Sequence, residues 1–575
     1  MTKVLRVGNC SAFFGDRFEA AREMIEGGPL DFLTGDYLAE LTLAILARKR
    51  MKSPGSGYAQ TFVGQLEEIA ETAISKGVRI VVNAGGLDPA ACAEACREVY
   101  KKLGLEARVA HLEGDDVLSR LGALEKEGVF LHRMESGERL DRSEKPILTA
   151  NAYLGARGIA KALDAGADLV ICPRVTDASL VVGPAIHHFG WAHDDYDAIA
   201  SAIVAGHILE CGPQTTGGNY TRFEEVPDLE RPGFPIAEIE EDGSFTVTKH
   251  EGTGGLVSEP TVKAQILYEI TGPRYTNPDA IARFDTLEIE EVGPDRVRVS
   301  GVKGEPAPST YKVSAHRLAG FRNRVSFVFR GGRVEEKAAL AERTLLHKLG
   351  GKAQFAAYHS ELEGGGDFGI LHVGVRDPNP KKVGRAFTNR AVELGTANYP
   401  GMNLTAPPEG EKPALEVFSA LLDKRYVKEV VILEGERIEV EPAAPGVVDP
   451  IPEVEAPTLE TPGGERELRQ LRDVFYARSG DKGSDANLAI YSQTEAGFAF
   501  LLNELTVERL KELMPEAAAC EIERFVFPKL KALNFVIHNF LDGGVAQSLK
   551  ADPQAKALGE QLLNQKMPLP KSLFS

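Results

Sequence analysis

Apolar runs alternate with amphipathic runs along the first half of the chain, and this alternation predicts strands joined by helices. Residues 3–9 form a short apolar strand that ends in a loop. Residues 37–49 and 63–76 have apolar residues at helical spacing, and an apolar run rich in β-branched residues follows in 77–88. Such a pattern is typical of a mostly parallel sheet with helical crossovers.

One unit of this pattern occurs twice. Residues 77–88 read GVRIVVNAGGLD, and residues 166–177 read GADLVICPRVTD. Each follows a helical stretch, begins with glycine, continues as an apolar strand and ends at an aspartate, Asp88 or Asp177. Each aspartate precedes another expected helix, so it is a candidate either for capping that helix or for contacting a ligand. Parallel sheets bind ligands at the carboxyl ends of their strands, where both loops belong.

Two further segments carry polar residues at high density. Residues 206–220 (GHILECGPQTTGGNY) combine glycines with threonines and a histidine, and are either a ligand-contacting loop or a flexible turn between subdomains. Residues 478–487 (RSGDKGSDAN) place charged side chains around two glycines. This segment either folds over an anionic or hydroxylated ligand or is the polar tip of a hairpin.

The second half of the chain has a different pattern of apolar and polar residues. Short alternating segments separated by glycine or proline predict antiparallel strands from about 225 to 335, followed by a helix over 336–349. Residues 439–466 are dense in proline and glutamate, which is typical of an extended linker. We therefore expect an α/β fold with four parts: 1–224 with the parallel sheet, 225–440 as a β-rich portion of the same core, 441–467 as linker, and 468–575 as a small α+β domain.

Composition and charge narrow the classes of partner and compartment. The formal net charge of −18 disfavours nucleic acid and anionic membranes, although a local cluster of basic residues still suits a small anion. Six scattered cysteines, no secretory leader and no apolar run of about 18 residues fit a reduced, cytoplasmic protein.

Several familiar catalytic signatures are absent from the sequence. It contains no phosphate-binding G-x-x-x-x-G-K-[ST] loop, no G-x-G-x-x-G after a strand, no H-E-x-x-H and no G-x-S-x-G. We therefore expect no nucleotide or redox cofactor, while the presence of a divalent metal among the aspartates stays open.

The strings VGNCSAFFGDR, VVNAGGLDP, GADLVICPRVTDASL and ECGPQTTGGNY resemble the acyclic terpene utilisation (AtuA) family over residues of about 4–445. The tail around FYARSGDKGSDANLAIYS is similar to the ferredoxin-fold domain that often accompanies this family. The resemblance implies a part in the breakdown of branched terpenoid acids as CoA thioesters. It implies no particular set of catalytic residues.

Our first hypothesis is an enzyme that acts on a branched acyl-CoA by hydration–dehydration or C–C cleavage, with CoA as part of the substrate. Asp16 and Asp177 are candidates for acid–base catalysis and Arg174 for holding a carboxylate or a thioester oxygen. The candidate substrate-binding residues are Asn83, Gly85, Gly86, Asp88, Thr176, His207, Cys211, Thr215, Thr216, Asn219, Arg478, Ser479, Asp481 and Lys482.

The second hypothesis is a non-catalytic binding or assembly subunit for a carboxylase or dehydrogenase of the same pathway. The separate C-terminal domain and its long linker motivate this alternative. In either case we expect a homo-oligomer, as is common for proteins of this class.

Overall fold

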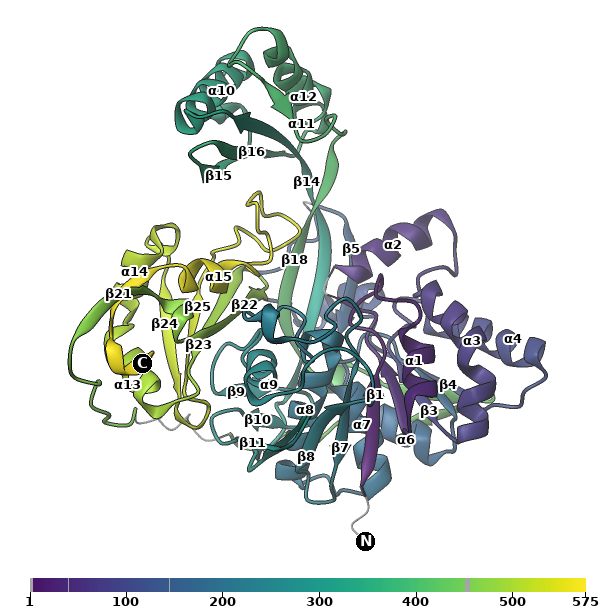
Figure 1. Cartoon of the computed structure of the whole chain (residues 1–575). Helices are drawn as coiled ribbons and strands as arrows, with labels where there is room; N and C mark the ends of the chain where they lie inside the picture. The colour runs from purple at the N-terminus through teal and green to yellow at the C-terminus, as the bar shows by residue number, and fades with distance from the viewer. Residues whose placement is uncertain (1–3, 40, 144, 449, 451–455, 575) are drawn as a thin grey trace.

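The computed structural model describes residues 4–39, 41–143, 145–448, 450 and 456–574, and its centre is a mixed sheet of eleven strands (Figure 1). The inner five strands are parallel and lie in the order β1 (Leu5–Asn9), β2 (Phe32–Gly35), β3 (Arg79–Val82), β6 (Leu169–Ile171) and β4 (Val109–Glu113). The predicted α/β class with a mostly parallel sheet is confirmed.

Helices cover both faces of this parallel core. One face carries α1 (Ala20–Gly27), α3 (Gln60–Lys76) and α4 (Pro89–Leu103); the other carries α6 (Arg157–Asp164), α7 (Ser179–Phe189) and α8 (Tyr196–Glu210). Neighbouring residues of β3 point to opposite faces, so Val82 packs with the first helix group and Val81 with the second. Each strand therefore reads as a continuous apolar run.

The two repeated units become neighbours in the sheet. β3 pairs with β6 in parallel, with Val82 opposite Ile171. Beyond the strands, the Cys172 amide donates to the Val82 carbonyl at 2.7 Å, and the Gly85 amide donates to the Cys172 carbonyl at 3.1 Å. The repeat in the sequence thus places its two loops side by side.

The two aspartates that end these units do not cap helices as the sequence suggested. Asp88 directly precedes α4, with Pro89 in the first position, but its side chain makes no capping hydrogen bond. It accepts instead from the Gly57 amide at 2.7 Å. α7 begins only at Ser179, so Asp177 lies outside the capping position and pairs with Arg174.

The antiparallel strands expected in the second half extend the same sheet at both edges. Beyond β1 it continues as β7 (Pro235–Ile239), β8 (Phe245–Lys249), β12 (Arg296–Ser300) and β11 (Glu288–Gly293). Beyond β4 it continues as the hairpin of β19 (Val430–Leu433) and β20 (Glu436–Glu439). Residue 225 therefore marks a change in strand direction within one sheet.

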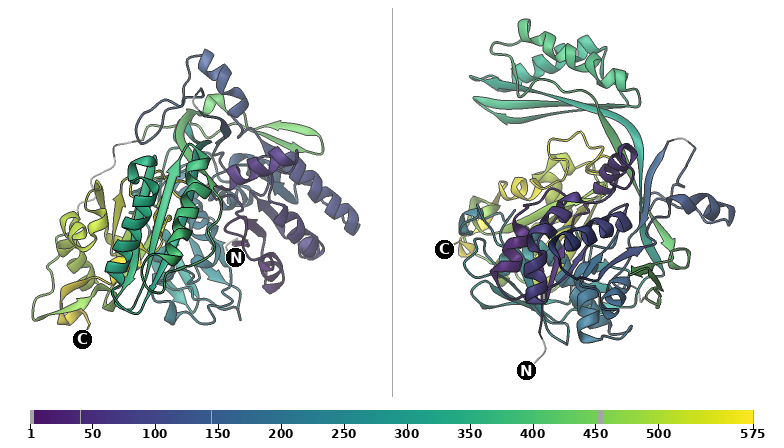
Figure 2. Two further views of the ribbon diagram at one scale, coloured as in Figure 1. Left: turned by 90° about the horizontal axis from the view of Figure 1, so that it is seen from above. Right: turned by 90° about the vertical axis from the view of Figure 1, so that its right-hand side faces the viewer.

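A strand of 21 residues, β14 (Thr310–Arg330), carries a projecting arm (Figures 1 and 2). Its first half pairs with β5 (Ile147–Ala152) and β18 (Lys412–Asp423) in the body. Its second half enters the arm, residues 321–411, where it pairs with β16 (Phe368–Asp377) and β17 (Asn403–Leu404), and β16 pairs with β15 (Ala357–Gly365). Three helices cover one face of the arm sheet: α10 (Val334–Leu349), α11 (Pro380–Val383) and α12 (Arg385–Val392). The arm has its own apolar core.

The C-terminal domain is built on a four-stranded antiparallel sheet in the order β22 (Tyr476–Lys482), β23 (Asp485–Tyr491), β25 (Ala532–Ile537) and β24 (Ile522–Phe527). The helices α13 (Glu495–Glu504), α14 (Val507–Leu513) and α15 (Leu558–Leu563) complete a ferredoxin-like domain with a core of its own. Two further strands, β21 (Arg466–Gln470) and β26 (Lys566–Pro570), form a separate antiparallel pair. β21 begins within the last residues of the expected linker.

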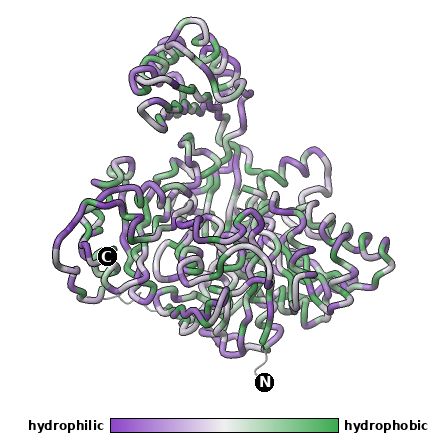
Figure 3. Tube along the Cα trace, viewed as in Figure 1, coloured by the Kyte–Doolittle hydropathy of each residue, from purple (hydrophilic) through white to green (hydrophobic). Residues whose placement is uncertain are grey.

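Hydropathy follows this arrangement. Figure 3 shows hydrophilic stretches along the outer loops of both body and arm. In the expected linker, the described residues 440–448, 450 and 456–465 form no helix or strand, while 449 and 451–455 lie outside the described residues. None of the helices in the described part of the chain has the length and apolarity that a membrane crossing requires.

Substitution of Gly85 tests the close approach of the repeated loops. A Cβ at this position would lie 2.6 Å from the Cys172 carbonyl oxygen, which is backbone and cannot easily move away. We expect Gly85→Ala to lower the free energy of unfolding by about 1–3 kcal/mol in urea titrations. Gly395→Ala is the control, because nothing lies within 4 Å of its added Cβ, and it should change stability by less than about 0.5 kcal/mol. Equal stability of both variants would contradict the close approach.

Candidate functional site

Polar side chains gather at the carboxyl ends of the parallel strands, and we call this group the strand-end cluster. Asp36 follows β2, Asn83 follows β3, Asp115 follows β4, and Arg174 and Asp177 follow β6. The Asn83 side chain donates to Asp36 Oδ1 at 2.6 Å and accepts from the Tyr37 amide at the same distance. Adjacent parallel strands thus place their polar loops in contact with one another.

Arg174 connects these loops. Its side chain is almost fully buried and lies over the ring of Tyr153, 4.4 Å from the ring centre. Nη1 donates to the Leu38 carbonyl at 2.5 Å, Nε donates to the Val175 carbonyl at 2.7 Å, and Nη2 donates to Asp177 Oδ1. The guanidinium therefore fixes the loops after β2 and β6 and holds the carboxylate of Asp177, whose side chain is one-third exposed.

Three carboxyl groups act on one another in this cluster. Burial, together with the negative charge of Asp177, raises the pKa of Asp36 well above its ordinary value. Burial, followed by the charges of Asp177 and Glu269, also raises the pKa of Glu210 at the end of α8. Both shifts favour the protonated forms of Asp36 and Glu210, while Asp177 has Arg174 as its ion-pair partner. Neighbouring carboxyls therefore lie in different electrostatic environments.

Asp115 supports the cluster from the next strand. Its carboxyl accepts from the Asn151 side chain at 2.7 Å and from the Arg174 amide at 3.2 Å. Burial raises its pKa to about 7. Asp115 therefore changes its protonation state near neutral pH while in direct contact with the backbone of Arg174.

The end of α8 contributes buried groups that lack hydrogen-bond partners. His207 Nε2 donates to the Gln265 carbonyl at 3.1 Å, and Nδ1 lies 3.3 Å from Glu210 Oε1. Neither His207 Nδ1 nor Glu210 Oε2 has a hydrogen-bond partner within the described residues. Burial and the charge of Lys482 lower the pKa of His207 to about 4, so the ring is neutral. Unsatisfied buried polar atoms are costly and mark the place where a ligand or water binds.

Cys211 lies next to this pair, at the start of the loop. Burial, and then the charges of Glu210 and Glu269, raises the pKa of its thiol well above the ordinary value. The thiol is therefore protonated, which argues against a nucleophilic role for Cys211.

The C-terminal domain completes the cluster with the hairpin of β22 and β23. Arg478 is buried, donates to the Gln214 side chain and lies 4.0 Å from the centre of the Tyr268 ring. Lys482, at the end of β22, lies 6.0 Å from the centre of the Tyr275 ring, and its charge acts on His207 and Glu210. The segment 478–487 is thus a hairpin with a turn between Lys482 and Asp485, and it packs against the N-terminal half.

A cavity of about 250 Å³ lies beside Arg478, between the 219–223 loop and the C-terminal domain. Its walls come from Asn219, Tyr220, Thr221, Phe223, Ala477, Arg478, Ser479, Lys556, Gly559 and Glu560. Three of these residues, Asn219, Arg478 and Ser479, were also candidates from the sequence. Ser479 Oγ accepts from the Gly559 amide at 2.9 Å and donates to the Lys556 carbonyl at 3.2 Å, so it holds one wall in place.

Other predicted residues hold loops through backbone contacts. Asp16 accepts from the amides of Ala12 at 2.8 Å and Arg17 at 2.7 Å within its own loop. The Thr215 hydroxyl donates to the Ile208 carbonyl, and the Thr216 hydroxyl donates to the Gly233 carbonyl at 2.7 Å.

The remaining candidates lie in or beside the strand-end loops, except Asp481, which lies in the C-terminal hairpin. Thr176 Oγ1 accepts from the Asn277 side chain at 2.9 Å. Gly86 has a φ of +52°, and a Cβ there would lie 2.8 Å from the Gly57 carbonyl oxygen. Asp481 lies on β22 opposite Ala486.

Sequence reasoning missed several members of the cluster, namely Asp36, Asp115, Glu210 and Glu269. The first two had the same signal as the recognised loops, because each aspartate follows an apolar strand and a glycine, in FLTGD and HLEGD. Glu210 and Glu269 had no such signal. Their position depends on α8 and on the C-terminal hairpin folding against the body. Within the described residues, no group of three or more His, Cys, Asp or Glu side chains is placed to hold a metal ion.

Comparison with known families gives two matches. The family described as acyclic terpene utilisation family protein AtuA matches residues 5–433. The AtuA ferredoxin-like domain matches residues 469–568. A search of proteins with curated function found no match. The matched ranges cover the body with its arm, and then the C-terminal domain.

The raised pKa of Asp115 makes stability depend on pH. The folded protein retains a proton that the unfolded chain releases near pH 3.8, so this stabilisation is complete below that pH and is lost as pH rises through about 7. Relative to Asp115→Asn, we expect the wild type to lose up to about 4 kcal/mol of unfolding free energy between pH 4 and pH 7.5. Asp116→Asn, at the exposed neighbour, should follow the wild type. Parallel curves for wild type and Asp115→Asn would contradict the shift.

Proposed function

This chain belongs to the acyclic terpene utilisation (AtuA) family, and on that premise we propose that it is an enzyme of branched terpenoid acid breakdown. The proposed reaction is the addition or removal of water at a branched acyl-CoA thioester bound over the strand-end cluster. The observation that carries the proposal is a set of neighbouring carboxyls in different environments: Asp177 pairs with Arg174, while Glu210 is buried and has an oxygen without a hydrogen-bond partner within the described residues.

Acid–base chemistry of this kind needs one base and one acid. In the dehydration direction, the Asp177 carboxylate removes a proton from the carbon next to the thioester carbonyl. Protonated Glu210 then donates its proton to the leaving 3-hydroxyl group, so that water departs and a double bond forms. Addition of water follows the same steps in reverse. Buried carboxyls with shifted pKa values suit this exchange.

Basic groups have separate tasks in this scheme. Arg174 is a positioning residue, because its donors hold Asp177 and two backbone carbonyls. Lys482 would stabilise the negative charge that develops on the thioester oxygen, since its charge acts on His207 and Glu210 from the C-terminal hairpin. The cavity beside Arg478, with the exposed ring of Phe223 at its wall, offers an apolar surface for the branched chain.

A non-catalytic assembly subunit is the second candidate function. The projecting arm favours it, because Phe368 and Val392 are large apolar side chains exposed there. In this case the chain would work through a carboxylase or dehydrogenase of the same pathway.

Asp177→Asn separates the two functions. Turnover of a panel of branched enoyl- and 3-hydroxyacyl-CoA esters, followed by mass spectrometry, should fall by at least about 100-fold in this variant, measured on protein that circular dichroism shows to be folded. Asp194→Asn removes an exposed carboxylate and is the matched control. Asp16→Asn tests the other carboxylate suggested by the sequence.

Two outcomes would overturn the enzymatic proposal. One is no turnover of any ester by the wild type together with no binding in calorimetry. The other is activity that depends only on formation of a complex with a partner enzyme and is equal in wild type and Asp177→Asn. The second outcome would support the assembly subunit.

A further inference from the structure

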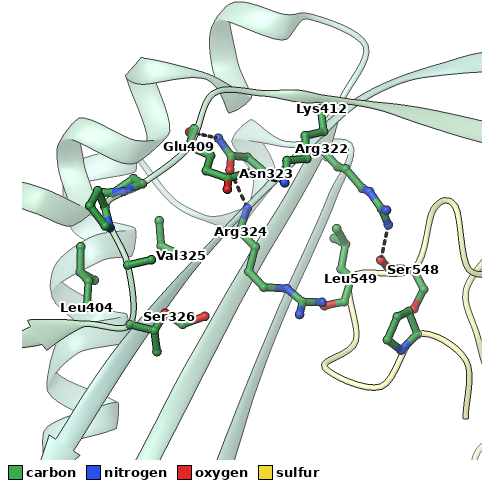
Figure 4. A pocket seen from close by; sticks show the side chains of 15 residues that line it. Arg322, Asn323, Arg324, Val325, Ser326, Leu404, Glu409, Lys412, Ser548 and Leu549 are labelled. Carbon is green, nitrogen blue, oxygen red and sulfur yellow. Dashed lines mark hydrogen bonds and ion pairs between the residues drawn. The ribbon is translucent and has the colours of Figure 1, made fainter. Parts of the chain in front are cut away.

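A second cavity, of about 390 Å³, lies where the arm meets the C-terminal domain (Figure 4). β14 changes pairing partners here: β17 ends at Leu404, opposite Phe327, and β18 begins at Lys412, opposite Arg322. The Thr405 amide still donates to the Ser326 carbonyl at 3.1 Å, and residues 406–411 then form no strand pairing with β14, which leaves residues 323–326 beside the cavity. Ser548, Leu549 and Pro553 close it from the C-terminal domain.

Cations dominate the polar lining. Arg322, Arg324 and Lys412 reach the cavity, where Glu409 is the one carboxylate of the lining and pairs with Lys412. Arg322 Nη1 donates to the carbonyls of Val545 at 3.3 Å and Ser548 at 3.0 Å. Arg324 Nη2 donates to the carbonyls of Leu549 at 3.1 Å and Lys550.

These two guanidiniums have carbonyl oxygens as acceptors and no carboxylate. Among the ion pairs of the described residues, none involves Arg322 or Arg324. Burial, followed by repulsion from Arg324 and Arg376, lowers the pKa of Arg322. Burial also lowers the pKa of Arg324, although the charges of Glu361 and Glu363 act against that shift. An anion in the cavity would stabilise both partly buried cations. Guanidinium forks match phosphate oxygens in geometry.

We propose that this cavity binds an organic phosphate of nucleotide size. Its volume lies in the range of small-ligand sites. The phosphate would meet Arg322, Arg324 and Lys412, while Val325, Leu404 and Pro407 provide an apolar wall for the organic part. A free nucleotide and the nucleotide portion of CoA share this chemistry.

The site is separate from the strand-end cluster. The Lys312 carbonyl accepts from Tyr153, whose ring covers Arg174, and ten residues of β14 separate Lys312 from Arg322. At about 3.3 Å per residue, this separation along the strand is roughly 30 Å. A bound phosphate would therefore join the arm to the C-terminal domain away from the proposed chemistry. Asp177→Asn should leave its binding unchanged.

Isothermal titration of the full chain with ADP, CoA, inorganic phosphate and adenosine tests the proposal. We expect ADP or CoA to bind and adenosine, which has no phosphate, to bind at least about tenfold more weakly. Binding of CoA without ADP would assign the site to CoA, and binding of both would assign it to nucleotides in general.

Lys412 is exposed and does not contact the 545–550 segment. Lys412→Glu therefore reverses one charge and keeps the contact between the arm and that segment. It should weaken phosphate binding at least about tenfold, and Arg324→Lys should weaken it less than Arg324→Ala. Lys381→Glu, an exposed lysine elsewhere on the arm, is the matched control. Failure of every phosphate compound to bind, equal binding of adenosine and ADP, or unchanged binding in Lys412→Glu would overturn the proposal.

Discussion

The buried guanidinium of Arg174 is the contact on which the proposed active site depends. It lies under Tyr153, holds Asp177, and donates to the backbone of the loops that follow β2 and β6. A buried charge that loses its partner costs about 3–5 kcal/mol, so these loops and the carboxylate have one stable arrangement rather than several. The same rigidity leaves Asp177 partly exposed at the surface of the cluster while Asp36 remains buried, with a raised pKa.

Repulsion between the carboxyl groups determines which of them can ionise together. Asp36, Asp177 and Glu210 cannot all ionise at low cost, because Arg174 is the guanidinium that pairs with Asp177 and Lys482 approaches from another domain. The charge balance therefore depends on the C-terminal hairpin, whose packing brings Lys482 within reach of His207 and Glu210. The proposed pairing of acid and base thus requires both domains to be docked.

The sequence predicted the centre of the fold better than its edges, for physical reasons. The apolar strands of 77–88 and 166–177 predicted parallel neighbours, and β3 and β6 do pair, because buried parallel strands have an unmistakable continuous apolar pattern. The 206–220 segment was only partly a loop, since α8 is apolar all round and continues to Glu210. The capping roles given to Asp88 and Asp177 were wrong because tertiary partners, Gly57 and Arg174, competed for their carboxylates. The function stays a proposal, since family and fold do not specify a reaction.

Sequence reasoning missed the arm because the local pattern does not show which strands pair with β14 along its length. The alternation of buried and partly exposed residues is interrupted in the middle of β14, where the register shifts between Leu318 and Gly320, but the partners before and after this point come from distant parts of the chain. The arm then meets the C-terminal domain through three arginines, Arg322, Arg324 and Arg376, which donate to carbonyl oxygens of residues 545–550. Carbonyl acceptors satisfy the geometry of a guanidinium but do not neutralise its charge. The contact that positions the arm therefore gives Arg322 carbonyl partners rather than a carboxylate, and an anionic ligand would neutralise its charge.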